Sequence, residues 1–202
     1  LLGLAIPAAI LALREMFKTS VQGREDLKQL TVPFAGEIPL AGGKKKWFWQ
    51  KQPKTTQSPE VLVAEKNRDI MNEAFRVVRS NLEFLLGFDA AHKVVMLTSL
   101  TPGSGKTFIS ANLSTAVGLK DKKVLAIDLD LRKGSLSSYV GSPSDGISGY
   151  LSGKKDDVQS MIVPLGKVDV RPCGTLPPNP SELLYTQRFA QLIETVREQY
   201  DY

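Results

Sequence analysis

Cysteine and histidine are almost absent from this sequence. Its 202 residues contain one cysteine, Cys173, and one histidine, His92. A single cysteine excludes an internal disulfide and is typical of a protein in a reducing compartment such as the cytoplasm. We assign Cys173 no catalytic role. His92, just before a predicted strand, fits a surface turn better than a metal ligand.

A long apolar run is absent as well. Residues 1–13 carry no charge, but they are fewer than the about 20 residues that a helix needs to span a bilayer. The first residue is not methionine, and the basic residues Arg14, Lys18, Arg24 and Lys28 follow the run. We interpret residues 1–13 as the end of a transmembrane helix that begins outside the given sequence, with the next domain cytoplasmic under the positive-inside rule. A buried core helix is the alternative, and a signal peptide would need a basic segment before the run.

Residues 41–60 form a basic and proline-containing linker after a juxtamembrane segment at 14–40. Residues 44–54 hold five lysines, no acid and both tryptophans of the sequence, and prolines follow. Such composition favours a flexible linker. One hypothesis is that its lysines contact anionic lipid of the inner leaflet, at about 1 kcal/mol each. An inert linker is an alternative. Nucleic-acid binding is another, but no recognition module accompanies the patch, so we predict no nucleic-acid partner.

A turn rich in glycine lies between a β-branched run at residues 93–98 and a helical segment at 105–119. The turn, here called the phosphate loop, consists of Pro102, Gly103, Ser104, Gly105, Lys106 and Thr107. Its glycines let backbone N–H groups surround an anion, and the helix N-terminus adds a favourable dipole. Lys106 would then reach the β- and γ-phosphates of a nucleotide, and Thr107 would bind Mg²⁺. Leu100 replaces the usual first glycine, so we predict a deviant Walker A loop; the alternative is a simple strand-to-helix turn.

Two acids, Asp128 and Asp130, follow a second apolar run. The run predicts a strand at residues 123–128 that is buried on both faces of a parallel sheet. Residues two apart in a strand project to the same side, so both carboxylates would face the crevice at the carboxyl end of the sheet. Adjacent acids repel each other and favour a cation such as Mg²⁺. One acid would serve the metal and the other the attacking hydroxyl; a pair of solvated acids is the alternative.

Three further motifs accompany the phosphate loop. Residues 71–86 contain Glu-x-x-Arg-x-x-Arg, formed by Glu73, Arg76 and Arg79. Residues 127–132 read Ile-Asp-Leu-Asp-Leu-Arg, and residues 176–184 read Leu-Pro-Pro-Asn-Pro-Ser-Glu-Leu-Leu. In this order the motifs resemble the bacterial tyrosine autokinases that regulate capsule and exopolysaccharide export. Thr101 stands where the related partition and septum-site ATPases carry an extra lysine, which favours the kinases.

The resemblance implies a fold, a reaction and a set of site residues. The fold is an α/β P-loop NTPase-like domain with a parallel sheet, at residues 61–202. The reaction is γ-phosphoryl transfer from Mg²⁺–ATP to a tyrosine hydroxyl of a neighbouring subunit. Catalysis would rest on Lys106, Asp128 and Asp130, the metal on Thr107 and the two acids, and nucleotide binding on the phosphate loop with Arg132. The family's Walker B strand and tyrosine-rich tail would lie beyond residue 202, so we expect this portion alone not to turn over ATP.

The resemblance also implies location and partners. The protein would lie at the bacterial inner membrane with a cytoplasmic kinase domain, and it would form a homo-oligomer through Glu73, Arg76 and Arg79. Its other partners would be the machinery of polysaccharide export and polymerisation and a phosphotyrosine phosphatase. Two alternatives remain from other classes: a switch ATPase of the partition or septum-site type, and a polysaccharide chain-length regulator with a vestigial nucleotide domain.

Periodicity predicts the remaining elements. On the 71–86 helix a core-facing stripe leaves Glu73, Arg76 and Arg79 on the exposed side. A third strand is predicted at 168–172, and residues 134–153 form loop and short helix. A last helix is predicted at 182–199, where Asn179 and Glu182 would form a capping box. The predicted stripe consists of Met71, Phe75, Val78, Leu82 and Leu85.

Overall fold

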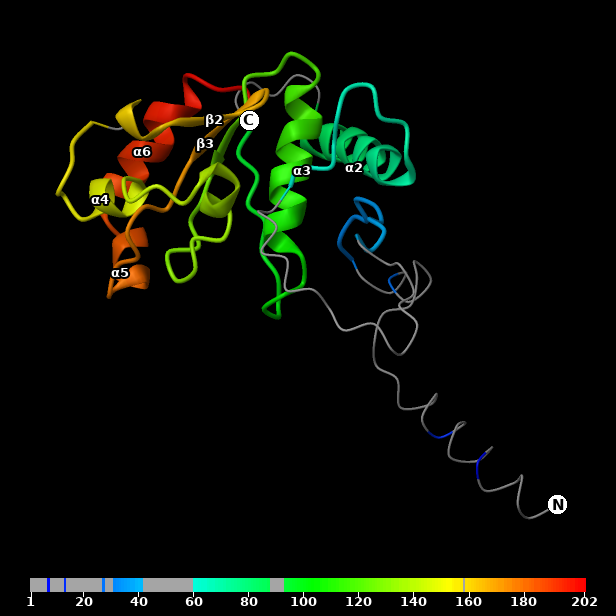
Figure 1. The fold of residues 1–202 in the computed structure, drawn as a ribbon, viewed down its shortest axis with the longest axis horizontal. Helices are drawn as coiled ribbons and strands as arrows, with labels where there is room; N and C mark the ends of the chain where they lie inside the picture. The colour runs from blue at the N-terminus through cyan, green and yellow to red at the C-terminus, as the bar shows by residue number, and fades with distance from the viewer. Residues whose placement is uncertain are drawn as a thin grey trace. The chain divides into compact units, whose positions relative to one another are not determined.

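The computed structural model describes residues 7, 13, 27, 31–41, 60–87, 93–157 and 159–202. The chain divides into two units, Leu1–Phe34 and Ala35–Tyr202, and every helix and strand named below belongs to the second (Figure 1). Within the described residues, no helix combines the length and the apolar character needed to cross a membrane. Residues 42–59 of the linker predicted at 41–60 lie outside the described residues, as do His92 and nearly all of the predicted membrane segment.

A three-stranded sheet lies at the centre of the second unit, in the order β1-β3-β2. β1 (Leu125–Ile127) runs parallel to β3 (Val168–Arg171), with Ile127 opposite Arg171. β2 (Val163–Leu165) pairs antiparallel with β3 and forms a hairpin with it. The parallel β1–β3 pair confirms the predicted α/β class, and the two strands fall within the predicted ranges. The β2 hairpin edge was not predicted.

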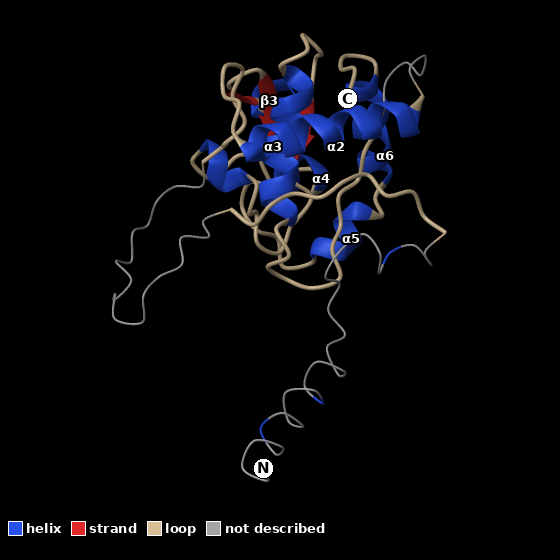
Figure 2. Cartoon of the chain, turned by 90° about the vertical axis from the view of Figure 1, so that its right-hand side faces the viewer, coloured by secondary structure: helices blue, strands red, loops and turns tan. Residues whose placement is uncertain are grey.

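Helices cover both faces of this sheet, so the unit has an α/β/α arrangement with one further helix outside. α3 covers one face and α4 to α6 cover the other, while α2 packs against α3 on the side away from the sheet (Figure 1). Figure 2 shows the short strands, in red, flanked by these helices. The bounds are α2 (Ile70–Leu86), α3 (Lys106–Gly118), the 3₁₀ helix η2 (Ser137–Val140), α4 (Ile147–Leu151), the 3₁₀ helix η3 (Gln159–Met161), α5 (Pro180–Leu184) and α6 (Gln187–Arg197).

The alternation of side chains along the strands explains why both faces are covered. In β3, Val168 and Val170 are buried toward α3. In β1, Leu125 and Ile127 pack on the opposite side, in the cluster that includes α4, α5 and α6. Side chains of successive strand residues point to opposite faces, so a strand with apolar residues at every position needs a helical layer on each side. The resulting core fixes the carboxyl end of β1, where the predicted site lies.

α2 begins one residue before the predicted helix, and four of the five residues in its predicted stripe pack in the cluster with α3. The carboxylate of Asp69 caps the helix by accepting the N–H of Asn72 at 2.8 Å, and hydrogen bonding from Asn72 lowers the pKa of Asp69. Phe75 and Val78 are buried against α3, as predicted. Leu85 was wrongly assigned to the buried stripe: it lies in the last turn of the helix and is 44% exposed.

Two predicted elements differ from the structure. Residues 93–98 form no strand, although their side chains alternate between exposed and half-buried. Lys93 donates its N–H to the carbonyl of Asp201 at 2.8 Å, but no further backbone hydrogen bond among the described residues extends this contact into a ladder. A strand needs such a ladder, and the side-chain pattern alone does not supply one.

The second difference is a break in the last predicted helix. The range 182–199 is divided between α5 and α6 at Thr186, whose backbone is extended. The Thr186 hydroxyl caps α6, accepting the N–H of Phe189 at 3.4 Å. Asn179 does not cap α5 with its side chain; it donates its amide to the Glu182 carboxylate at 2.8 Å. The predicted capping box is therefore not formed, because a side chain–side chain bond replaces both of its bonds to backbone N–H groups.

Candidate nucleotide-binding site

The phosphate loop has the backbone shape that its glycines permit. Gly103 and Gly105 have φ angles of +83° and +88°, which other residues adopt only with strain, and α3 begins directly after them at Lys106. Within the described part of the chain, no hydrogen bond uses the N–H of Gly105, Lys106 or Thr107. These donors at a helix N-terminus remain available to an anion.

The polar side chains of the loop hold it in place. The Ser104 hydroxyl donates to the carbonyl of Thr101 at 2.8 Å and lies 2.7 Å from the Thr101 hydroxyl. Ser99 donates to the same carbonyl at 3.1 Å. Thr101, the residue that replaces the extra lysine of the related ATPases, is thus part of the loop's own hydrogen-bond network.

Lys106 and Asp130 meet across the site. The Lys106 ammonium lies 3.2 Å from Oδ2 of Asp130, and both side chains are partly exposed, at 32% and 25%. Lys106 comes from the first turn of α3, and Asp130 from the turn that follows β1. The pair places a positive charge next to the loop's N–H groups, where the phosphates of a nucleotide would lie.

Asp128 has quite different surroundings. It is 3% exposed, and its Oδ2 accepts both the N–H of Ser137 at 2.8 Å and the hydroxyl of Ser137 at 2.7 Å. Its Oδ1 accepts the N–H of Asp130 at 3.2 Å. The alternation of side chains along a strand predicted that both acids would face the same crevice. β1 ends at Ile127, so this alternation does not extend to Asp130, and the two acids have different surroundings.

Ser137 is a site residue that sequence analysis missed. Besides donating to Asp128, its hydroxyl accepts the N–H of Cys173 at 2.7 Å. Burial, followed by the nearby charges of Asp128 and Asp130, raises the pKa of the Cys173 thiol to about 11. Cys173 is therefore a buried thiol that stays neutral near pH 7. No local motif marks Ser137, because only the fold brings it to the end of β1.

The remaining predicted residues lie around this centre. Thr107 is half-buried in the first turn of α3, next to Lys106. Pro102, Gly103 and Ser104 are exposed in the loop, and Arg132 is exposed in the turn after Asp130. The Thr107 hydroxyl and the two carboxylates are hard oxygen donors of the kind that Mg²⁺ takes. Asp130 is already paired with the Lys106 ammonium, whereas Oδ1 of Asp128 accepts a single hydrogen bond and keeps acceptor capacity for a cation.

The predicted oligomer residues on α2 are divided by the structure. Glu73 and Arg76 form an exposed pair at 2.6 Å. Arg79 was wrongly placed on the exposed side: its side chain is 12% exposed and donates to the carbonyl of Ala116 in α3 at 2.8 Å. The packing of α2 against α3 brings Arg79 within reach of that helix and gives it a partner within the chain.

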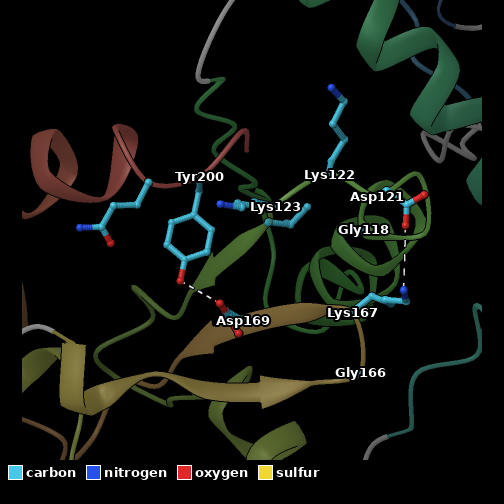
Figure 3. A pocket seen from close by; sticks show the side chains of 10 residues that line it. Gly118, Asp121, Lys122, Lys123, Gly166, Lys167, Asp169 and Tyr200 are labelled. Carbon is cyan, nitrogen blue, oxygen red and sulfur yellow. Dashed lines mark hydrogen bonds and ion pairs between the residues drawn. The ribbon is translucent and has the colours of Figure 1, made fainter.

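A hollow of about 560 Å³ lies at the other end of the strands, beside the amino ends of β1 and β3 (Figure 3). The Tyr200 hydroxyl donates to Asp169 there at 2.8 Å, and Lys167 lies 3.9 Å from Asp121. Burial, with this hydrogen bond, raises the pKa of Tyr200 to about 12. None of the predicted site residues lines this hollow, so it is separate from the phosphate loop.

The loop, the acids at the end of β1 and the α/β/α layers define a P-loop nucleotide-binding protein. Residues 95–201 match the family model described as the CobQ/CobB/MinD/ParA nucleotide binding domain, and the chain belongs to this family. Over its full length it is homologous to the tyrosine-protein kinase Etk of Escherichia coli K12, at 35% identity, and to the tyrosine-protein kinase Wzc of Salmonella typhimurium, at 33%. The chain spans 29% and 28% of the lengths of these two relatives.

Solved structures agree with this relationship. The kinase domain of the Escherichia coli tyrosine kinase ETK matches with a TM-score of 0.77 at 34% identity, over 90% of this chain and 71% of that one. The chimerical protein CapA2B2 matches with a TM-score of 0.71 at 32% identity, over 89% of this chain and 73% of that one. The P-loop α/β fold predicted from the sequence is confirmed.

Proposed function

We propose that this chain is the nucleotide-binding portion of a membrane-anchored, ATP-dependent protein-tyrosine autokinase that regulates capsular or exopolysaccharide synthesis and export. The observation that carries the proposal is the Lys106–Asp130 pair at 3.2 Å beside a loop with uncommitted N–H groups. The homology to Etk and Wzc supports kinase chemistry over hydrolysis alone.

The loop would act mainly by binding and neutralising charge. Its N–H groups receive the phosphates of ATP, and Lys106 leaves Asp130 to pair with the β- and γ-phosphates. Thr107 and one of the two acids would hold Mg²⁺, which would neutralise charge that develops on the transferred phosphoryl group, and the other acid would serve the attacking hydroxyl. Arg132 would bind the nucleotide from the turn after Asp130.

Release of Asp130 from Lys106 would affect the tyrosine that accepts the phosphoryl group. The freed carboxylate becomes available to orient the attacking tyrosine hydroxyl and to accept its proton. In-line transfer then joins the tyrosine oxygen to the γ-phosphorus as the bond to the β-phosphate oxygen breaks. The tyrosine would come from a neighbouring subunit.

The proposed assembly follows from the same homology. We propose a homo-oligomer that uses the exposed Glu73 and Arg76 of α2, at the inner membrane, together with polysaccharide export and polymerisation machinery and a phosphotyrosine phosphatase. Arg79 has a contact to Ala116 within the chain, so its part in such an interface would be indirect.

The test is to incubate the protein that carries this chain with Mg²⁺–ATP and to map phosphotyrosine by mass spectrometry, with Lys106→Met as the control. We expect phosphotyrosine in the wild type and none in the variant. ATP hydrolysis without phosphotyrosine would instead support a switch ATPase, a class that the matched family model also includes by name. The absence of both phosphotyrosine and ATP hydrolysis would support the polysaccharide chain-length regulator.

A further inference from the structure

The contacts of Ser137 show that its hydroxyl has a fixed direction. A serine hydroxyl has one proton to donate and lone pairs to accept with. Here the Cys173 N–H at 2.7 Å fills the acceptor side, and the proton is directed to Oδ2 of Asp128, also at 2.7 Å. Ser137 is 3% exposed, so water does not compete for either bond. The residue links the end of β3 to the acid at the end of β1.

This arrangement makes the two oxygens of Asp128 unequal. Oδ2 receives two donors from Ser137, at 2.8 and 2.7 Å, while Oδ1 receives one longer contact from the Asp130 N–H, at 3.2 Å. A carboxylate oxygen accepts about two hydrogen bonds. Oδ2 is therefore saturated, and Oδ1 keeps acceptor capacity for a further partner.

We propose that Ser137 is the positioning residue of the site: it holds Asp128 so that Oδ1 is the oxygen offered to the Mg²⁺ shell, while Asp130 serves Lys106 and the acceptor hydroxyl. This inference rests on the proposed nucleotide site. It assigns the metal to Asp128 because that carboxylate is immobilised, and the proton to Asp130 because its partner, Lys106, is the group that the phosphates would draw away.

Partners that orient metal ligands typically change metal affinity or activity by about 10- to 100-fold when they are removed. Ser137→Ala deletes the hydroxyl but keeps the backbone N–H that also reaches Asp128. We therefore expect the lower end of that range, about a tenfold rise in the Mg²⁺ concentration that half-saturates binding. Binding of nucleotide without Mg²⁺ should not change.

The experiment titrates Mg²⁺ into the protein with a fluorescent N-methylanthraniloyl ATP analogue and reads binding, not phosphorylation. Ser137→Thr keeps the hydroxyl and should remain within about twofold of the wild type. Ser138→Ala is the matched control, because the neighbouring hydroxyl donates to the Ser135 carbonyl at 2.6 Å and contacts neither acid. If Ser137→Ala does not fold, Ser137→Cys replaces it, since the thiol has a similar shape and donates only weakly.

The proposal is overturned if Ser137→Ala leaves the half-saturating Mg²⁺ concentration unchanged. It is also overturned if Ser137→Thr raises that concentration as much as Ser137→Ala does, because the effect would then come from packing and not from the hydroxyl. Because the readout is binding, a protein that binds Mg²⁺–nucleotide normally but makes no phosphotyrosine contradicts the proposed kinase function and leaves this test decisive. A wild type that binds no Mg²⁺–nucleotide contradicts both.

Discussion

Lys106 and Asp130 show how single residues prepare the site for its ligand. Each neutralises the other at 3.2 Å, and neither is fully buried. A partly exposed ion pair is worth little, on the order of 1 kcal/mol or less, so phosphates that approach the loop displace Asp130 at small cost. We therefore propose that the pair is a resting arrangement that the phosphates of a nucleotide would open.

At the residue scale, the buried thiol of Cys173 predicts how its reactivity depends on pH. Burial raises the pKa of its thiol to about 11, so at pH 8 roughly one thiol in a thousand is ionised. We expect very slow reaction with a thiol reagent in the native protein, with a rate that rises with pH toward 11, and rapid reaction in urea. Because the folded pKa lies above the unfolded one, folding is favoured by the neutral thiol at low pH, and this contribution is lost as pH rises through the folded pKa.

The reagent's absorbance, followed at several pH values, provides the measurement. A native thiol that reacts at pH 7 as fast as the unfolded one would show that Cys173 is not buried as described.

Some of the site could be predicted at the residue scale and some could not. Lys106 and Thr107 follow from a local pattern, and Asp130 from its position just after a buried strand. Ser137 could not be found, because nine residues separate it from Asp128 and only the turn before η2 brings them together. Local motifs report local geometry; contacts between loops depend on packing.

At the scale of elements, the contact between α2 and α3 distinguishes two arginines of one motif. Arg79 donates to the Ala116 carbonyl at 2.8 Å, whereas Arg76 pairs with Glu73 in solvent. We expect Arg79→Ala to lower the free energy of unfolding by about 1.5 kcal/mol or more, since a hydrogen bond to a charged group is lost in a half-buried place. Arg76→Ala, the matched control, should cost less than about 0.5 kcal/mol.

Urea denaturation followed by circular dichroism measures both variants. Equal losses would contradict the different roles of the two residues. A monomeric state of Arg76→Glu, with stability unchanged, would in turn support the proposed oligomer contact.

The elements that sequence analysis predicted well are those with strong local signals. α3 follows a glycine turn, and α2 has a clear apolar stripe. The predicted strand at 93–98 fails because pairing is a property of two segments, and its only described backbone bond is at Lys93. The helix at 182–199 fails because Thr186 adopts an extended backbone and starts a new helix, a choice that helical periodicity does not record.

At the scale of the whole molecule, the α/β/α layers place the phosphate loop and the acids near the carboxyl ends of β1 and β3, and the hollow beside the amino ends of these strands (Figure 3). The chain covers 71% of the solved ETK kinase domain with which it aligns. It contains the loop, the paired acids and the α2 motif, so nucleotide binding can be measured in the protein that carries this chain, independently of tyrosine phosphorylation.

The most direct test of the account is an isothermal titration of Mg²⁺–ATP into the protein that carries this chain and into its Lys106→Met variant. We predict one site in the wild type and at least about tenfold weaker binding in the variant, because the variant loses a charge-assisted hydrogen bond to phosphate. Equal affinities, or no binding to the wild type, would contradict the assignment of residues 102–107 as the nucleotide site.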